Sequence, residues 1–226
     1  MSQIASAVAS ITERIGSAAT RVRRDPASVT LVAVTKTVAA AQVREALACG
    51  ISDVGENRVQ EAVNKRAEVA AGRWHLIGPL QSNKSTVAAG LFDVIETVDS
   101  LRLAERLARA RANGPPLDAL LEVELTGLPG RAGVQRAGLL ELAREVARLP
   151  GLRLRGLMTV AAPAADPEEV RPTFRRLRGL RDLLELELEL ELPELSMGMS
   201  GDYEVAIEEG ATTVRIGRAL FGGRTS

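Results

Sequence analysis

Lysine is scarce in this chain, and its placement is the first sign of chemistry. The 226 residues include 29 Lys and Arg residues, of which only Lys36, Lys65 and Lys84 are lysines. Arg supplies a permanent positive charge, whereas Lys is a primary amine that can attack a carbonyl and form a Schiff base. Lys36 ends the apolar run at residues 31–35, so it is a candidate for amine chemistry. Its position alone fits a surface lysine equally well.

Two glycine-containing segments near the end of the chain could hold a phosphate. Residues 196–202 read SMGMSGD, and residues 215–218 read RIGR. Small residues and hydroxyls leave backbone N–H groups open to an anion. Either segment alone is a weak signal, because many turns contain Gly and Ser. Together with a lysine at the end of a strand, they point to pyridoxal phosphate, which carries both an aldehyde and a phosphate.

Arg215, two residues before Gly217, is placed to face the pyridine nitrogen of such a cofactor. An Asp partner would keep that nitrogen protonated and make the ring a strong electron sink, whereas an Arg partner disfavours protonation. We therefore expect little or no chemistry at an α-carbon. The alternative for Arg215 is a surface salt bridge.

Eight β-rich runs alternate with amphipathic helical stretches. The predicted strands cover residues 30–36, 53–55, 74–77, 92–98, 117–125, 152–160, 194–197 and 212–216. This alternation predicts one α/β domain over residues 1–226, a (β/α)8 TIM barrel with an extra N-terminal helix at residues 2–23. The rival is a doubly wound open sheet, but the residues after the first run lack its glycine fingerprint. In a barrel, Lys36 and both glycine segments share the rim at the carboxyl ends of the strands.

Eight further helices are predicted after the N-terminal one. Helices are expected at residues 39–49, 56–70, 82–89, 101–112, 138–148, from Pro167 onward, at 203–209 and at 218–221, with Asp99 or Ser100 capping the fourth.

Residues 183–192 read LLELELELEL, a period of two that is typical of a strand with one acidic face. Because this repeat follows a helical pattern and precedes Pro193, we interpret it as a solvated expansion, helical at first and irregular later.

Composition excludes several classes of function. The 29 acidic residues balance the 29 basic ones, so the chain offers no field to attract nucleic acid or an anionic membrane. The sequence shows neither a membrane span nor a secretory signal. The single cysteine, Cys49, excludes an internal disulfide and fits the cytoplasm. One His and one Tyr argue against a Ser-His-Asp site and a multi-histidine metal site.

Three further residues receive structural interpretations. His75 is expected to be a hydrogen-bonded packing residue rather than an acid–base group. Lys84 is expected to be a loop lysine, although it could bind a second anion. Lys65 lies in a helix beside Arg66 and is expected to be exposed to solvent.

Six runs carry a family resemblance and cover nearly the whole chain. They are LVAVTK (31–36), VGENRVQEA (54–62), WHLIGPLQSNK (74–84), LRGLMTV (154–160), LSMGMSGDYEVAIEEGAT (195–212) and VRIGRALFG (214–222). In these runs the chain resembles the pyridoxal phosphate homeostasis proteins, which are similar to the barrel domain of alanine racemase without its second domain. The resemblance implies a monomer that holds or delivers pyridoxal phosphate, with PLP-dependent apo-enzymes as recipients.

The resemblance also implies roles for individual residues. Lys36 would carry the cofactor as a Schiff base, and Arg215 would face the ring nitrogen. The pocket and the phosphate site would be completed by Asn57, Met158, Ser200, Gly201, Ile216 and Gly217. The chain departs from the family pattern at Pro79, at residues 122–124, at residues 130–133 and at Arg218, and none of these departures touches Lys36.

Three functions remain open on sequence grounds. The first is a non-catalytic pyridoxal phosphate carrier. The second is a racemase-like enzyme with weak activity, which needs a second proton carrier opposite the lysine. Tyr203, the single tyrosine, belongs to the phosphate-side helix and does not meet that need. The third is a phosphate- or nucleotide-binding barrel without a Schiff base, which would leave Lys36 unexplained.

Overall fold

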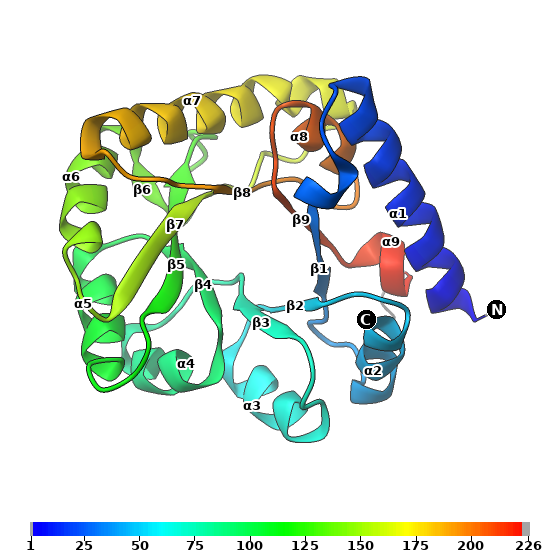
Figure 1. Ribbon diagram of the computed structural model, residues 1–226, viewed down its shortest axis with the longest axis horizontal. Helices are drawn as coiled ribbons and strands as arrows, with labels where there is room; N and C mark the ends of the chain where they lie inside the picture. The colour runs from blue at the N-terminus through cyan, green and yellow to red at the C-terminus, as the bar shows by residue number, and fades with distance from the viewer. Residues whose placement is uncertain (1, 223–226) are drawn as a thin grey trace.

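The structure, a computed structural model, describes residues 2–222. Eight parallel strands form one sheet in the order β4-β3-β2-β1-β9-β8-β7-β5, and pairing between β4 and β5 closes it into a barrel (Figure 1). The predicted TIM barrel is therefore confirmed, and the open sheet is excluded. The barrel strands are β1 (Thr30–Val34), β2 (Asp53–Glu56), β3 (Arg73–Leu76), β4 (Val94–Val98), β5 (Leu117–Glu124), β7 (Leu152–Met158), β8 (Glu194–Ser196) and β9 (Thr213–Ile216).

Helices surround the barrel, as Figure 1 shows. A short strand, β6 (Val134–Gln135), pairs with the end of β5 and lies outside the ring. Short 3-10 helices occupy Pro26–Ser28, Ser82–Lys84 and Pro167–Val170. The α-helices are α1 (Gln3–Arg21), α2 (Ala40–Ala48), α3 (Val59–Glu68), α4 (Ser85–Leu91), α5 (Leu101–Ala110), α6 (Arg136–Ala147), α7 (Arg171–Leu188), α8 (Tyr203–Glu208) and α9 (Arg218–Phe221).

The extra N-terminal helix α1 packs against the last two helices of the barrel. Its buried residues Ile4, Val8, Ile11 and Ile15 recur at helical spacing, which produces one apolar stripe. This stripe faces α8 and α9, beside which α1 runs in Figure 1. On its polar face, arginines form ion pairs with Glu204 of α8. The helix therefore braces the elements that follow β8 and β9.

Two element boundaries near the rim differ from the sequence-based expectation. β1 ends at Val34 rather than at residue 36, because the Val38 N–H turns back to the Thr35 carbonyl. The prediction that a helix begins at Glu56 is wrong, since Glu56 pairs with Leu76 of β3 and ends β2. Lys36 therefore lies two residues beyond its strand, in a turn.

One helix start and one helix cap also differ from the expectation, although α5 begins at Leu101 as predicted. Pro167 begins a 3-10 turn, and the long helix α7 starts only at Arg171. Ser100 occupies the N-cap position of α5 but makes no capping bond among the described residues, because its hydroxyl donates to the Asp99 carboxylate instead.

The Leu/Glu repeat behaves as expected from its context rather than from its period of two. α7 continues into the repeat and ends at Leu188, and the C-cap residue Glu189 has a left-handed backbone (φ 52°). Leu186 is 77% exposed, so the repeat contributes little to the core there. Within residues 2–222, no helix is long and apolar enough to cross a bilayer, and no group of His, Cys, Asp or Glu side chains could hold a metal ion.

Candidate functional site

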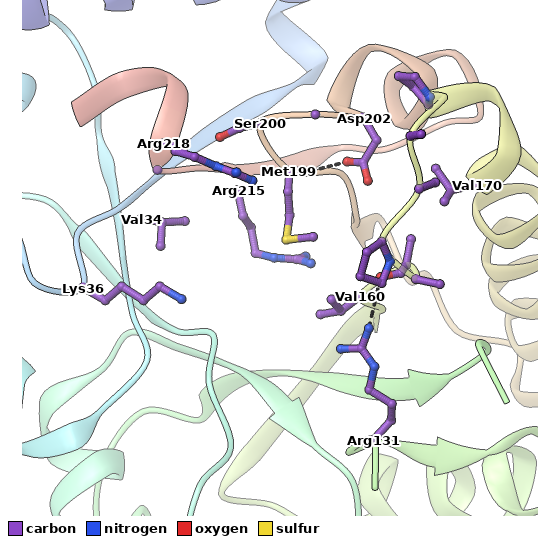
Figure 2. Close-up of a pocket in the computed structure, with 18 residues that line it drawn as sticks. Val34, Lys36, Arg131, Val160, Val170, Met199, Ser200, Asp202, Arg215 and Arg218 are labelled. Atoms are coloured by element: carbon purple, nitrogen blue, oxygen red, sulfur yellow. Dashed lines mark hydrogen bonds between the residues drawn. The ribbon is translucent and has the colours of Figure 1, made fainter. Parts of the chain in front are cut away.

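A cavity of about 680 Å³ opens at the carboxyl ends of the strands. Its wall combines the end of β1, the loop after β8, the segment after β9 and the loop after β7 (Figure 2). The lining residues are Val34, Lys36, Arg131, Val160, Ala161, Ala162, Pro163, Ala164, Ala165, Pro167, Val170, Met199, Ser200, Gly201, Asp202, Arg215, Gly217 and Arg218. The fold therefore brings Lys36, Arg215 and both glycine segments to one cavity.

Lys36 enters the cavity from a strained turn. Figure 2 shows its side chain extending from the β1 side toward Arg215. The next residue, Thr37, has a φ of 63°, which is an outlier for a β-branched side chain. Such a conformation costs on the order of 1–3 kcal/mol and persists only where the surroundings impose it. The backbone of the turn that carries Lys36 is thus held by neighbouring structure.

The loop after β8 forms an open cradle of backbone groups. Gly198 has a φ of 93°, and a Cβ there would lie 2.6 Å from the Ala206 Cβ, so only glycine permits this close approach to α8. The N–H groups of Ser200 and Gly201 donate no hydrogen bond within residues 2–222. The Ser200 hydroxyl accepts a hydrogen bond from the Ala219 N–H at 3.2 Å, which ties this loop to the segment after β9. This arrangement suits an anion that accepts several backbone hydrogen bonds.

Arg215 projects from β9 into the barrel and is held on two sides. Its guanidinium donates to the Ser196 hydroxyl at 2.6 Å and to the Thr159 carbonyl at 2.8 Å. The carboxylate of Glu96 lies 3.8 Å from it. Burial lowers the pKa of Arg215 from its ordinary value, while Glu96 opposes that shift. The surface salt bridge considered for this residue is therefore ruled out, since Arg215 is 4% exposed.

A buried polar chain continues from Arg215 across the barrel. The Ser196 hydroxyl donates to Glu96 at 2.5 Å, although β8 and β4 are separated by β7 and β5. The other Glu96 oxygen lies 2.7 Å from His75 Nδ1, and His75 Nε2 lies 2.8 Å from Asp53. Burial opposes a charge on His75, but the hydrogen bonds from its ring to both carboxylates raise its pKa to about 9. His75 is therefore a cation that holds this chain together, which extends its predicted packing role.

Glu122 is a second buried acid near Arg215. The residue is 8% exposed, and its Oε2 atom has no hydrogen-bond partner within the described residues. Burial raises the pKa of Glu122 to about 7, and Arg215 opposes the shift. A carboxyl group with this pKa is partly protonated near neutral pH, so the electrostatic field at Arg215 changes with its protonation.

Comparison with known proteins decides the family. The profile described as "Alanine racemase, N-terminal domain" matches residues 8–225. The chain belongs to this family. It is 49% identical to the pyridoxal phosphate homeostasis protein of Pseudomonas aeruginosa, over 99% of this chain and 97% of the relative. The Escherichia coli K12 protein of the same name is 43% identical, over 99% of this chain and 98% of the relative.

A solved structure agrees with this assignment. PipY of Synechococcus elongatus PCC7942, whose structure was solved with PLP bound, is 42% identical and superposes with a TM-score of 0.83. The match covers 94% of this chain and all of PipY. Within the alanine racemase N-terminal domain family, the chain therefore groups with the pyridoxal phosphate homeostasis proteins, as its sequence motifs predict.

Three residues that the family resemblance places in the pocket lie outside the cavity lining. Asn57 follows β2, and extending the register in which Gly55 pairs with Val34 sets it beside Lys36. The Asn57 Oδ1 atom is buried without a hydrogen-bond partner in residues 2–222. Gly78 packs against the Asn57 backbone so closely that a Cβ on residue 78 would lie 2.5 Å from the Asn57 carbonyl oxygen. Met158, at the end of β7, and Ile216, at the end of β9, are at most 1% exposed. Their roles remain predictions.

Arg218 and the other two lysines lie in three different environments. Arg218 is exposed and lines the cavity beside Gly217. Lys84 is exposed at the end of a 3-10 helix and is not part of the lining. The expectation that Lys65 is exposed is wrong. Lys65 is 6% exposed, because its ammonium group turns inward to the carboxylate of Glu56 and the carbonyl of Thr35.

Sequence reasoning missed the acids inside the barrel. Glu96 lies within the apolar run VIETV, and Glu122 lies within LLEVE. A buried strand position is costly for a carboxylate unless it is paired, so an acid in such a run signals an interior partner. That signal could have identified both residues. It could not have paired Glu96 with Ser196 and His75, which only barrel closure brings together.

Proposed function

We propose that this chain binds pyridoxal 5′-phosphate through Lys36 and holds it for supply to other proteins in the cytoplasm. The observation that carries the proposal is the convergence of a lysine in the turn after β1, a backbone anion cradle and a buried arginine on one cavity. The names of the relatives and the PLP bound by PipY support the same ligand and a role in cofactor homeostasis.

The residues present fit this cofactor. The N–H groups of Ser200 and Gly201 and the Ser200 hydroxyl suit a phosphate, and Gly217 leaves room beside them. Lys36 reaches the cavity from the opposite wall in Figure 2, and Arg215 lies between them. One end of the cavity thus meets the phosphate, and the other meets the aldehyde.

Lys36 supplies the covalent link in this proposal. Its unprotonated amine attacks the aldehyde carbon, a C=N bond forms, and the carbonyl oxygen leaves as water. When bound, the pyridine ring can withdraw electrons from groups attached at that carbon. A guanidinium has donors and no acceptor, so Arg215 can only donate to the ring nitrogen and disfavours its protonation. Because Ser196 and Thr159 already hold Arg215, the position of this donor is fixed.

We propose that the chain holds the cofactor rather than catalysing a reaction on it, because neither Tyr203 nor Asp202 is placed to act as a second proton carrier opposite Lys36. The single tyrosine, Tyr203, is 1% exposed, has a buried hydroxyl and is not part of the lining. Asp202 is the one acid among the lining residues, and its carboxylate accepts the Met199 N–H at 2.6 Å within the cradle loop. Racemase-like activity is tested by exchange of the α-proton of alanine or serine, and steady exchange well above that of free cofactor would contradict holding.

We also propose which proteins receive the cofactor and in which oligomeric state the carrier acts. The recipients are PLP-dependent apo-enzymes, and the carrier acts as a monomer. Most of the large apolar side chains that are exposed in the described residues are scattered over separate elements, which supports a monomer. Light scattering of the loaded protein at micromolar concentration tests this, and a stable dimer would contradict it.

The direct test of the proposed function compares Lys36→Ala with Lys84→Ala. The wild-type protein mixed with pyridoxal phosphate develops the visible absorbance of the C=N link. Lys84→Ala retains it, because Lys84 is exposed and outside the cavity. Lys36→Ala loses it, and retention of the same band by this variant would refute the proposal.

A further inference from the structure

A buried lysine lies directly beneath the turn that carries Lys36. Lys65 belongs to α3, and its side chain is 7% exposed. Its ammonium group donates to the Thr35 carbonyl at 2.6 Å, to the Glu56 carboxylate, and to Glu61 Oε1 at 3.0 Å. An ammonium has three N–H donors, so every donor of Lys65 is used. This lysine is therefore a structural cation and not a second amine for the cofactor.

The two carboxylates that accept hydrogen bonds from Lys65 each hold a residue next to Lys36 as well. Thr35 precedes Lys36, and its hydroxyl donates to Glu56 at 2.6 Å. Thr37 follows Lys36, and its N–H donates to Glu61 at 2.5 Å. The Glu56 carboxylate is fully buried, and burial raises its pKa from the ordinary value of 4.5, while Lys65 and Thr35 oppose the shift. Lys65 with its two carboxylates therefore grips the chain on both sides of Lys36.

The strain at Thr37 shows why such a grip is needed. A β-branched residue at a φ of 63° leaves this conformation unless its neighbours prevent it. The bond from the Thr37 N–H to Glu61 is one restraint, and the Lys65 bond to the Thr35 carbonyl is another. If the turn relaxed, the Lys36 side chain would start from a different backbone position and its amine would move relative to the cradle.

We propose that Lys65, together with Glu56 and Glu61, is a positioning group that fixes the Lys36 amine for bond formation with the aldehyde of the cofactor. The inference rests on the proposed function. Lys65 acts only by holding the backbone next to Lys36, because it contacts the Thr35 carbonyl and is not part of the cavity lining. The covalent step is unchanged: the amine of Lys36 adds to the aldehyde carbon, and water leaves.

The test uses the full-length protein with Lys65→Met, which keeps the length of the side chain and removes the ammonium group. Lys84→Met is the matched control, because Lys84 is exposed. Two ligands are compared. Pyridoxal phosphate requires both the cradle and Lys36, whereas pyridoxine 5′-phosphate has an alcohol in place of the aldehyde and reports binding in the cradle alone.

The expected result separates the two ligands. Misplacement of a reacting group by about 1 Å can cost on the order of 100-fold in rate, so Lys65→Met should slow the appearance of the visible band by about 10–100-fold. Its affinity for pyridoxine 5′-phosphate, measured by calorimetry, should stay within about twofold of wild type. Adding Thr37→Gly should recover part of the lost rate, because glycine adopts a positive φ without strain. Lys84→Met should match wild type for both ligands.

Several outcomes would overturn the inference. A wild-type rate in Lys65→Met would show that the ammonium group does not position Lys36. An equal loss for both ligands would show a general collapse of the site. If Lys65→Met fails to fold, Glu61→Leu serves instead, because it removes the acceptor of the Thr37 N–H at a side chain that is 27% exposed. An unchanged rate in that variant would also refute the role. If wild type forms no visible band, the proposed function itself fails, which is a distinct result.

Discussion

Raising the pH from about 6.5 through 9 should remove the charge of His75 and destabilise the fold. The imidazole is 1% exposed and lies between the carboxylates of Asp53 and Glu96, at 2.8 and 2.7 Å. Burial opposes its charge, but the hydrogen bonds from its ring to the two carboxylates raise the pKa of His75 from 6.5 to about 9. Because the folded pKa exceeds the unfolded one, the stabilisation is complete below pH 6.5 and is lost as the pH rises through 9.

The magnitude follows from the pKa difference. At about 1.4 kcal/mol for each pKa unit, the step from 6.5 to about 9 corresponds to about 3 kcal/mol of unfolding free energy. In a chain of this size, such a loss lowers the melting temperature by about 6–12 °C. Other groups titrate in the same range, including Glu122, so the wild-type protein alone does not isolate His75.

The assay compares wild type with His75→Gln, which is neutral at every pH. Trp74, the single tryptophan, is fully buried beside His75, so its fluorescence reports unfolding in urea. The variant should be less stable at about pH 6, where two buried carboxylates lose their cation. The difference between the two proteins should shrink by about 3 kcal/mol by about pH 9.5. A difference that stays constant across this range would refute the charged state of His75.

Three further predictions follow from the cavity and the surface. Ser200→Asp places a carboxylate beside the phosphate cradle, and repulsion should weaken pyridoxal phosphate binding by at least about tenfold, measured by titration of the visible band; unchanged affinity would argue against phosphate at this loop. Arg215→Met removes two buried charged hydrogen bonds and should lower the unfolding free energy by about 1–3 kcal/mol in urea, whereas a surface arginine would show almost no loss. Leu186→Glu should change that free energy by less than about 0.5 kcal/mol, because Leu186 is 77% exposed, and a larger loss would show that the Leu/Glu repeat packs against the core.

The barrel could be predicted from sequence because its signals are local. Apolar runs of strand length alternate with helical periods, and parallel strands place their carboxyl ends on one rim. Lys36 and the SMGMSGD segment come from opposite ends of the chain, and that rule alone brings them together. The same rule predicted where the cavity would open.

The interior contacts could not be predicted because they depend on barrel closure. Lys65 occupies a helix beside Arg66, and nothing local distinguishes it from an exposed lysine. It is buried because β2 continues to Glu56 and presents a carboxylate under α3. The bond from Ser196 to Glu96 crosses the barrel between strands that are not neighbours. The strain at Thr37 likewise follows from contacts with distant residues rather than from its own sequence context.

Borohydride reduction followed by peptide mapping tests whether Lys36 carries the cofactor. Reduction fixes the C=N link, and trypsin does not cleave after a modified lysine. We expect one uncut peptide covering residues 25–44 that carries the mass of one reduced cofactor, in place of the separate peptides 25–36 and 37–44. Modification at Lys65 or Lys84 with Lys36 still cleaved, or no modification at all, would contradict it.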